Sequence, residues 1–174
     1  ALYYARSEET QRDYLIRETS LGDVIHGAVA DNKYLLRRHQ VKVEVEDAGI
    51  CACTDDKWLR FLLDQLISNA VKYRGSEPKL RFVAGERQGR VFLAVEDNGI
   101  GIPESDLPRI FDKGFTGTNG RLQKSSTGIG LYLCRKLCDK LGIGLTAESG
   151  GRGKGTRMEL TFPVDDFIAE VQEK

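Results

Sequence analysis

Apolar residues along the chain recur with two different periods, one typical of helices and one typical of strands. From residue 20 to about residue 38, and again from residue 55 or 56 to about residue 73, they recur every three or four positions, which predicts two amphipathic helices. Residues 41–46 alternate between valine and charged residues, which predicts a strand with one solvated face. Another, shorter strand is predicted at residues 50–53.

The second half of the chain is predicted to add two pairs of strands and two helices. Residues 87–89 contain a turn signal between the first two of these strands, as expected for a hairpin. The strands are expected at residues 80–86, 90–96, 144–149 and 156–162, and the helices at residues 103–111 and 131–141. This order of elements predicts an α/β (α+β) fold, a two-layer sandwich of a mixed, mostly antiparallel sheet and three main helices.

Size and charge narrow the range of functions. The chain has 174 residues, which fits one domain, and its 26 Lys and Arg residues balance its 26 Asp and Glu residues. A balanced charge creates no general field that would attract nucleic acid or a membrane surface, so neither is expected to bind this chain. No apolar run approaches the roughly 20 residues that a membrane-spanning helix needs. Because the chain begins with alanine, we expect it to be part of a longer protein.

Four residues that are not aliphatic follow a single stripe of the second predicted helix. At about 100° per residue their positions lie on one side of the helix, where they interrupt an otherwise apolar face. The residues are Gln65, Asn69, Lys72 and Tyr73. The stripe is either a solvated helix face or the wall of a polar site. Asn69 favours a site, because asparagine is a poor residue for a helix interior.

The stretch VEDNGIGI ends a predicted strand with a carboxylate and then alternates glycine with isoleucine. Most Gly-x-Gly pairs are plain turns. Here Asp97 stands at the end of the strand, so its side chain is expected to point into a cavity that Gly99 and Gly101 border. A fixed carboxylate can accept a hydrogen bond from the exocyclic amine of adenine, and Ile100 and Ile102 can contact the flat base.

A second pair of glycines precedes the last predicted helix. In the stretch STGIGLYL, Gly128 and Gly130 stand where unpaired backbone N–H groups and the helix dipole favour a phosphate. The stretch lacks the lysine of a P-loop and has no strand directly before it, so it matches neither a P-loop nor a dinucleotide fingerprint. A plain turn is the alternative interpretation.

Taken in order, these stretches resemble the motifs of one protein family. DQLISNAVKY resembles the N box, VEDNGIGI the first glycine box, IFDKGF the phenylalanine box, STGIGLYL the second glycine box and GKGTRMELTFP the closing glycine–threonine motif of the catalytic ATP-binding domain of bacterial sensor histidine kinases. These kinases share the GHKL superfamily with gyrase, the large heat-shock chaperone ATPase and mismatch-repair proteins. The resemblance covers residues 20–163 and implies a Bergerat-type ATP-binding fold. It makes residues 1–19 the end of a dimerisation and acceptor helix with its linker, and residues 164–174 a tail.

The resemblance implies a role for each motif in binding ATP and Mg²⁺. Asn69 would ligate Mg²⁺ held against the triphosphate, and Lys72 would meet phosphate. Asp97 would accept from the adenine amine, with Tyr73 along the adenine or ribose and Thr156 near the same edge. The other residues expected around ATP are Gly99, Gly101, Ile102, Lys113, Thr127, Gly128, Ile129, Gly130 and Leu131.

Residues 112–127, DKGFTGTNGRLQKSST, interrupt the regular pattern with glycine, serine, threonine and lysine. A loop of this length inside a compact domain is usually functional or disordered. The resemblance makes it a mobile lid over the phosphates. Lys113, Arg121 and Lys124 are its candidate charge partners for the triphosphate, and the sequence does not choose among them.

Gln65 departs from the family pattern. The N box commonly has asparagine at this position, and the ATPase relatives have a glutamate that activates the attacking water. Glutamine cannot act as a general base, so Gln65 favours phosphoryl transfer to a partner over hydrolysis, while its amide can still contact phosphate or Mg²⁺. Asn69, Lys72 and Gln65 are therefore the candidate catalytic residues. A self-contained ATPase switch is the alternative function, and a degenerate domain that only docks to partners is a third.

The resemblance also implies partners outside this chain. A histidine kinase phosphorylates a histidine within a motif that neither His26 nor His39 matches, so the dimerisation and histidine-phosphoacceptor domain is expected elsewhere in the same kinase. The segments DYLIRETSLGDVI and FDKGFTG look closest to the intramembrane-sensing kinases of antibiotic (bacitracin-type) response. That would imply a full-length homodimer in the cell membrane, a cytoplasmic location for this domain and a response-regulator partner.

Overall fold

The computed structural model describes residues 14–117 and 129–164. The strands of its main sheet are β2 (Lys42–Asp47), β4 (Lys79–Arg87), β5 (Arg90–Asp97), β6 (Gly144–Glu148) and β7 (Thr156–Thr161). Its helices are α2 (Leu21–Asp31), α3 (Lys33–Arg38), α4 (Asp56–Lys72) and α6 (Gly130–Leu141), with one 3₁₀ helix, η2 (Leu107–Arg109). Two further strands, β1 (Arg17–Ser20) and β3 (Cys51–Thr54), form a small antiparallel sheet of their own.

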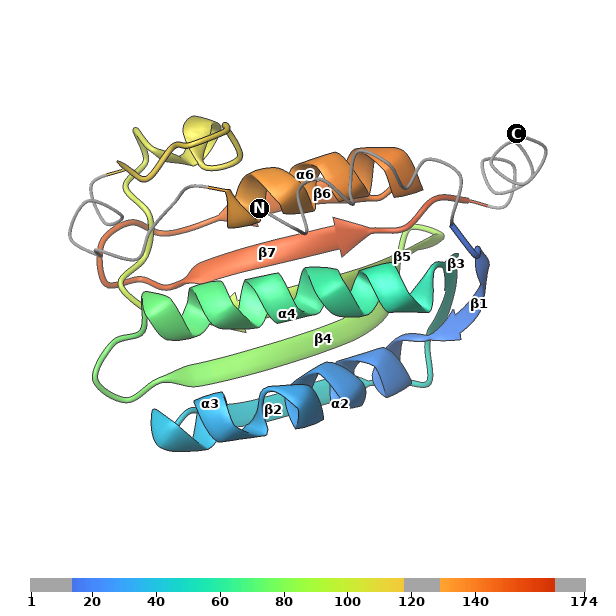
Figure 1. Ribbon diagram of the computed structural model, residues 1–174, viewed down its shortest axis with the longest axis horizontal. Coiled ribbons are helices and arrows are strands. Elements are labelled where there is room, and N and C mark those ends of the chain that lie inside the picture. The colour runs from blue at the N-terminus through green and yellow to red at the C-terminus, as the bar shows by residue number, and fades with distance from the viewer. Residues whose placement is uncertain (1–13, 118–128, 165–174) are drawn as a thin grey trace.

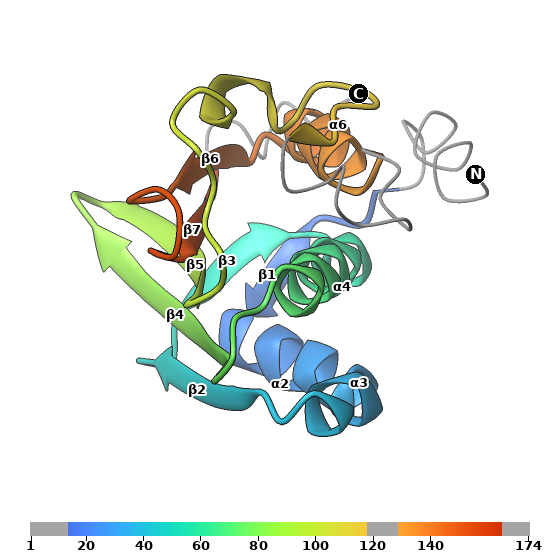
Figure 2. The same ribbon diagram turned by 90° about the vertical axis from the view of Figure 1, so that its left-hand side faces the viewer.

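These elements form two packed layers (Figure 1). The main sheet has the strand order β2-β4-β5-β7-β6, and the helices cover one of its faces (Figure 2). β2 pairs with β4 in parallel, and the other neighbouring strands pair antiparallel. The predicted two-layer fold with a mixed, mostly antiparallel sheet is therefore confirmed. Within the described part of the chain, no helix combines the length and apolar character needed to span a membrane.

The core lies between the two layers, where the predicted apolar faces meet. β4 alternates as expected, with Leu80, Phe82 and Ala84 buried and Arg81 and Val83 between them half-buried. α4 supplies the opposite side of the core with the buried residues Trp58, Leu59, Leu62, Leu63, Leu66, Ile67 and Val71. Burying so broad an apolar face fixes the rotation of α4 about its axis, and with it the direction of its polar stripe.

The single helix predicted from residue 20 to residue 38 is wrong, because the chain breaks at Asn32. The Asn32 side-chain amide donates to the carbonyl of Ala28 at 2.8 Å and to the Asp64 carboxylate on α4 at 2.9 Å. These bonds hold a junction at which α2 ends and α3 begins. Tyr34 of α3, two residues after this junction, is 75% exposed.

Two further expectations differ from the structure. Residues 17–19, expected in the linker, form β1 together with residue 20, and β1 pairs with β3. The helix expected at residues 103–111 is instead a series of turns around η2. Pro108 accounts for this, because its nitrogen has no hydrogen to donate to the preceding turn of an α-helix.

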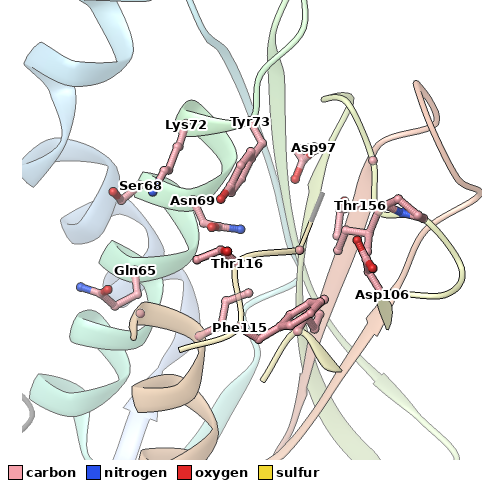
Figure 3. A pocket seen from close by; sticks show the side chains of 17 residues that line it. Gln65, Ser68, Asn69, Lys72, Tyr73, Asp97, Asp106, Phe115, Thr116 and Thr156 are labelled. Carbon is pink, nitrogen blue, oxygen red and sulfur yellow. The ribbon is translucent and has the colours of Figure 1, made fainter. Parts of the chain in front are cut away.

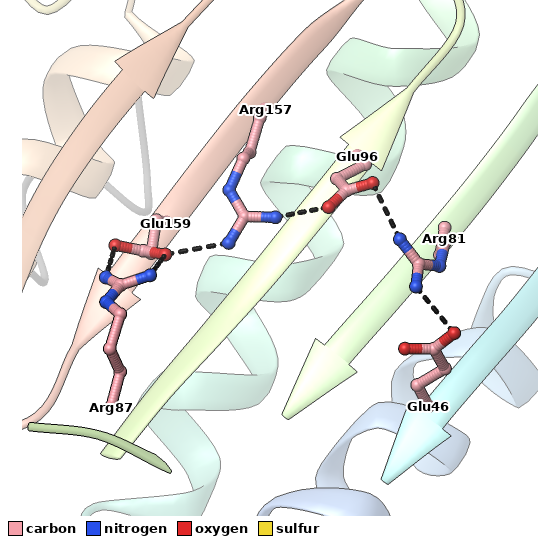
Figure 4. A network of polar contacts seen from close by, with 6 residues as sticks. All are labelled: Glu46, Arg81, Arg87, Glu96, Arg157 and Glu159. Carbon is pink, nitrogen blue, oxygen red and sulfur yellow. Dashed lines mark hydrogen bonds and ion pairs between the residues drawn. The ribbon is translucent and has the colours of Figure 1, made fainter. Parts of the chain in front are cut away.

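A chain of alternating charges crosses the outer face of the sheet, opposite the helices (Figure 4). Arg81 pairs with Glu46 at 2.5 Å and with Glu96 at 3.2 Å, Arg157 pairs with Glu96 and, at 2.8 Å, with Glu159, and Arg87 pairs with Glu159 at 2.7 Å. Partly exposed pairs of this kind contribute only about 0–1 kcal/mol each. Their effect is to link β2, β4, β5 and β7 side by side.

Asp55 ties the incoming chain to the start of α4. Its buried carboxylate caps the helix, because Oδ1 accepts from the Trp58 N–H at 3.0 Å. The other oxygen, Oδ2, accepts from the Leu15 N–H at 2.8 Å. Beside it, Asp56 pairs with Arg17 at 2.7 Å on the surface. One buried side chain therefore holds the segment before β1 and the helix that carries the polar stripe.

Replacing Asp55 with alanine should destabilise the protein by about 1–3 kcal/mol, because two backbone N–H groups lose their acceptor. The matched control is Asp56→Ala, which removes the exposed pair with Arg17 but leaves both contacts of Asp55 in place, and it should cost less than about 1 kcal/mol. Urea unfolding of both variants measures the difference. Equal losses of unfolding free energy in the two variants would show that Asp55 does not anchor the two segments.

Candidate active site

A cavity of about 290 Å³ opens at the carboxyl end of β5, between α4 and the start of α6 (Figure 3). Its size is at the lower end of the range for small-molecule sites, about 300–1,000 Å³. Its walls are the polar stripe of α4, the ends of β5 and β7, the first residues of α6 and the segment that follows β5.

The α4 wall contains all four residues of the predicted stripe together with Ser68. The list is Gln65, Ser68, Asn69, Lys72 and Tyr73. The stripe therefore lines a cavity and is not simply a solvated helix face. Lys72 Nζ lies 5.7 Å from the centre of the Tyr73 ring, and burial lowers the pKa of the Lys72 ammonium. Ser68 was missed because serine beside a polar stripe carries no signal of its own.

The sheet wall is built around Asp97, the last residue of β5. The register of β5 and β7 sets Asp97 opposite Thr156, and both side chains line the cavity with Ile102. Asp97 Oδ1 accepts a hydrogen bond from the Gly99 N–H at 2.9 Å. Burial raises the pKa of the Asp97 carboxyl, and hydrogen bonds from the backbones of Gly99 and Thr156 partly oppose that rise.

The glycines after Asp97 allow close contact within the protein rather than simply around a ligand. A Cβ on Gly99 would overlap the Tyr73 carbonyl oxygen at the end of α4, and Gly99 does not line the cavity. Gly101 does line it, has a φ of +74°, and would overlap the Gly151 carbonyl oxygen if it had a Cβ. The two glycines therefore let three backbone segments meet beside Asp97.

The segment after β5 forms a wall that the sequence did not assign residue by residue. Asp106, Ile110, Phe115, Thr116, Gly117 and Pro103 line the cavity. The Arg109 guanidinium stacks on the Phe115 ring at 4.4 Å, and Arg135 of α6 stacks on Phe111 at 4.3 Å. Phe115 had a signal, as an aromatic residue in a polar stretch within the phenylalanine box. Asp106 had none.

The start of α6 closes the cavity on the far side. Gly130 and Leu131 line it as expected. A Cβ on Gly130 would come within 3.1 Å of Gln65 Oε1, so glycine at this position leaves room for the Gln65 side chain between the two helices. Within the described residues, no side chain caps this end of α6.

Some expected site residues are not brought to the cavity. Ile129 precedes α6 without lining it. Lys113 is exposed, with Nζ 5.8 Å from the Tyr132 ring of α6, and it does not line the cavity either. Thr127 and Gly128, together with the lid residues Arg121 and Lys124, lie outside the described residues.

The cavity therefore joins two chemically different ends. Asp97 supplies a buried hydrogen-bond acceptor beside apolar Ile102. Lys72 and the N-terminus of α6 supply positive charge and backbone donors. This arrangement suits a ligand with an amine at one end and an anionic group at the other.

Comparison with known proteins identifies the family of the chain. Residues 54–166 match the family of histidine kinase-, DNA gyrase B-, and HSP90-like ATPases. The sensor histidine kinase GraS of Staphylococcus haemolyticus is 37% identical over 164 residues, which are 93% of this chain and 47% of GraS. The chain thus spans about half the length of the curated relatives it matches.

Solved structures of histidine kinases share the fold. The catalytic domain of histidine kinase ThkA has a TM-score of 0.72 at 22% identity, covering 86% of this chain and 95% of that one. ThkA in complex with response regulator protein TrrA has a TM-score of 0.73 at 20% identity, covering 93% of this chain and 46% of that one.

The raised pKa of Asp97 predicts how its stability contribution changes with pH. The folded protein holds this proton more tightly than the unfolded chain, so the contribution of Asp97 to stability falls as the pH rises from the unfolded pKa, about 3.9, through the higher folded pKa. Asp97→Asn removes this titration. We expect the variant to gain stability over the wild type between about pH 3 and neutral pH, measured by urea unfolding. A difference in unfolding free energy between the variant and the wild type that does not change with pH would contradict the prediction.

Proposed function

The chain belongs to the family of histidine kinase-, DNA gyrase B- and HSP90-like ATPases, and on this basis we propose that it is the ATP-binding catalytic domain of a sensor histidine kinase. In this role it transfers the γ-phosphoryl group of ATP to a histidine on a separate dimerisation domain. One observation carries the proposal: Asn69 on α4 and Asp97 at the end of β5 line the same cavity.

The sheet side of the cavity suits adenine. The Asp97 carboxylate accepts from the Gly99 N–H and has lone pairs for another donor. The exocyclic amine of adenine is such a donor, whereas the carbonyl of guanine would place an acceptor against the carboxylate. Ile102 offers apolar contact to the base, and Tyr73 and Thr156 lie in the same cavity.

The α4 and α6 side suits the triphosphate. Lys72 offers a positive charge, and Gly130 and Leu131 bring the N-terminus of α6 to the cavity, where backbone donors favour phosphate. Asn69 carries an amide oxygen, and Mg²⁺ usually binds proteins through one or two oxygen ligands together with phosphate oxygens and water. These donors fit Mg-ATP, with Asn69 as the metal ligand.

The proposed reaction is an in-line displacement. A ring nitrogen of the acceptor histidine bonds to the γ-phosphorus while the bond to the β–γ bridging oxygen breaks and ADP leaves. Positioning and charge neutralisation carry most of the catalysis in such transfers. Gln65 lines the cavity at the position where ATPase relatives have glutamate. An amide cannot take a proton from water, so Gln65 favours transfer over hydrolysis.

The acceptor is proposed to come from elsewhere in the same kinase. His26 is exposed on α2 and His39 follows α3, and neither lines the cavity. We assign residues 1–19 to the link with the dimerisation domain, residues 20–163 to the catalytic domain and residues 164–174 to a tail. The complex of ThkA with TrrA supports a response regulator as the next partner. The full-length protein is proposed to be a membrane-bound homodimer with this domain in the cytoplasm.

Variants of two neighbouring carboxylates distinguish a loss of base recognition from a general loss of negative charge. Asp97 faces the cavity, whereas Glu96 joins the ion-pair chain on the other face of the sheet. Asp97→Asn should weaken binding of both adenosine and ATP by at least about tenfold, because a charged acceptor is lost. Glu96→Gln should change these affinities by less than about twofold. Calorimetric titration measures both, and normal ATP affinity in Asp97→Asn would refute the assignment.

The reaction is tested by mixing the chain with γ-labelled ATP, Mg²⁺ and a separately produced acceptor hairpin of the full-length kinase. The wild type should label the hairpin. Asn69→Ala should lower labelling by at least about a hundredfold while keeping adenosine affinity, because it removes a phosphate-side ligand and leaves the base contacts. Steady ATP hydrolysis by the chain alone, without labelling, would instead support an ATPase switch.

A further inference from the structure

We propose that Ser149 is a positioning residue for the nucleotide site: its hydroxyl fixes the turn after β5 against the turn between β6 and β7. The inference rests on the proposed function, because the site it positions is the one assigned to adenine. Ser149 follows β6 and does not line the cavity. It acts through Gly101 and Ile102, which do.

The Ser149 hydroxyl uses its full hydrogen-bonding capacity. It donates to the Gly155 carbonyl at 2.6 Å and accepts from the Ile102 N–H at 3.0 Å and the Gly151 N–H at 3.3 Å. A hydroxyl has one hydrogen to donate and two lone pairs, so no capacity remains for a ligand. Two of these bonds close the β6–β7 turn on itself, and the bond from Ile102 crosses to the other turn.

Two backbone hydrogen bonds join the same two turns beside this contact. The Gly155 N–H donates to the Gly99 carbonyl at 3.1 Å, and the Gly153 N–H donates to the Ile100 carbonyl at 2.7 Å. Ile102 is two residues further on, and its N–H is taken by the Ser149 hydroxyl rather than by a backbone carbonyl. Ser149 therefore completes a short ladder between the turns.

This ladder sets the position of the cavity wall. Gly101 packs so closely on the Gly151 carbonyl and the Ser149 hydroxyl that no side chain fits there. The register of β5 and β7 places Asp97 and Thr156 at the same edge, directly before and after these turns. A shift of the β6–β7 turn would therefore move Ile102 relative to Asp97. Ile102 is assigned to apolar contact with the base and Asp97 to its exocyclic amine, so the two must keep their spacing to contact one base.

Removing the hydroxyl should disturb the base end of the site and leave the phosphate end in place. We expect Ser149→Ala to raise the dissociation constant for ATP by about tenfold, since the Ile102 and Gly151 N–H groups lose their acceptor. In the hairpin-labelling assay the KM for ATP should rise by a similar factor while kcat at saturating ATP is unchanged. Hydrogen exchange at the Ile102 amide should become faster in the ligand-free variant.

Two matched variants separate positioning from general stability. Ser149→Thr keeps the hydroxyl and should restore the ATP affinity to within about threefold of the wild type. Thr146→Ala removes an exposed hydroxyl from β6 and should leave both the affinity and the Ile102 exchange rate unchanged. Thermal unfolding of each variant confirms that the measured protein is folded.

The outcomes distinguish this inference from the function on which it rests. If the wild type binds no adenine nucleotide, the proposed function fails. If the wild type binds ATP and Ser149→Ala binds it equally well, the positioning role is refuted. Slow Ile102 exchange in Ser149→Ala, or a Thr variant as impaired as the Ala variant, would also refute it, because the hydroxyl would then not be the group that matters.

Discussion

The pairing of β5 with β7 is the interaction on which the site depends. Its register sets Asp97 opposite Thr156, so the carboxylate ends its strand at the cavity while Glu96, one residue earlier, faces the ion pairs on the opposite side. The same register brings the glycine turns that follow and precede these residues into backbone contact. A slip of one residue would turn Asp97 to the outer face, since successive side chains in a strand alternate.

The second wall of the site is placed by helix packing instead of strand pairing. α4 buries an apolar face on the sheet, and this contact fixes the direction of the stripe that contains Asn69 and Lys72. Asp55 caps the start of the helix, and Gly99 meets the carbonyl of Tyr73 at its end. The helix is thus held at both ends, and the separation of Asn69 from Asp97 follows from a rigid element packed on a rigid sheet.

Much of this could be predicted from the sequence because the signals are local. The alternation in β4 and the apolar period of α4 predicted their faces, and the position of Asp97 at a strand end placed its side chain. The break at Asn32 could not be predicted, because it depends on Asp64, 32 residues away. Ser149 was missed for the same reason: its partner Ile102 is 47 residues away, and only the fold brings the two together.

The electrostatics of the cavity are consistent with the nucleotide proposed as its ligand. Burial disfavours charge at both ends, raising the pKa of the Asp97 carboxyl and lowering that of the Lys72 ammonium. A ligand that donates to the carboxylate and carries negative charge to the ammonium favours the charged form of both groups. The exocyclic amine of adenine and the phosphates of ATP supply these two features in one molecule. On the proposed function, the cost of burying each charge in the free protein would therefore become a source of selectivity when ATP binds.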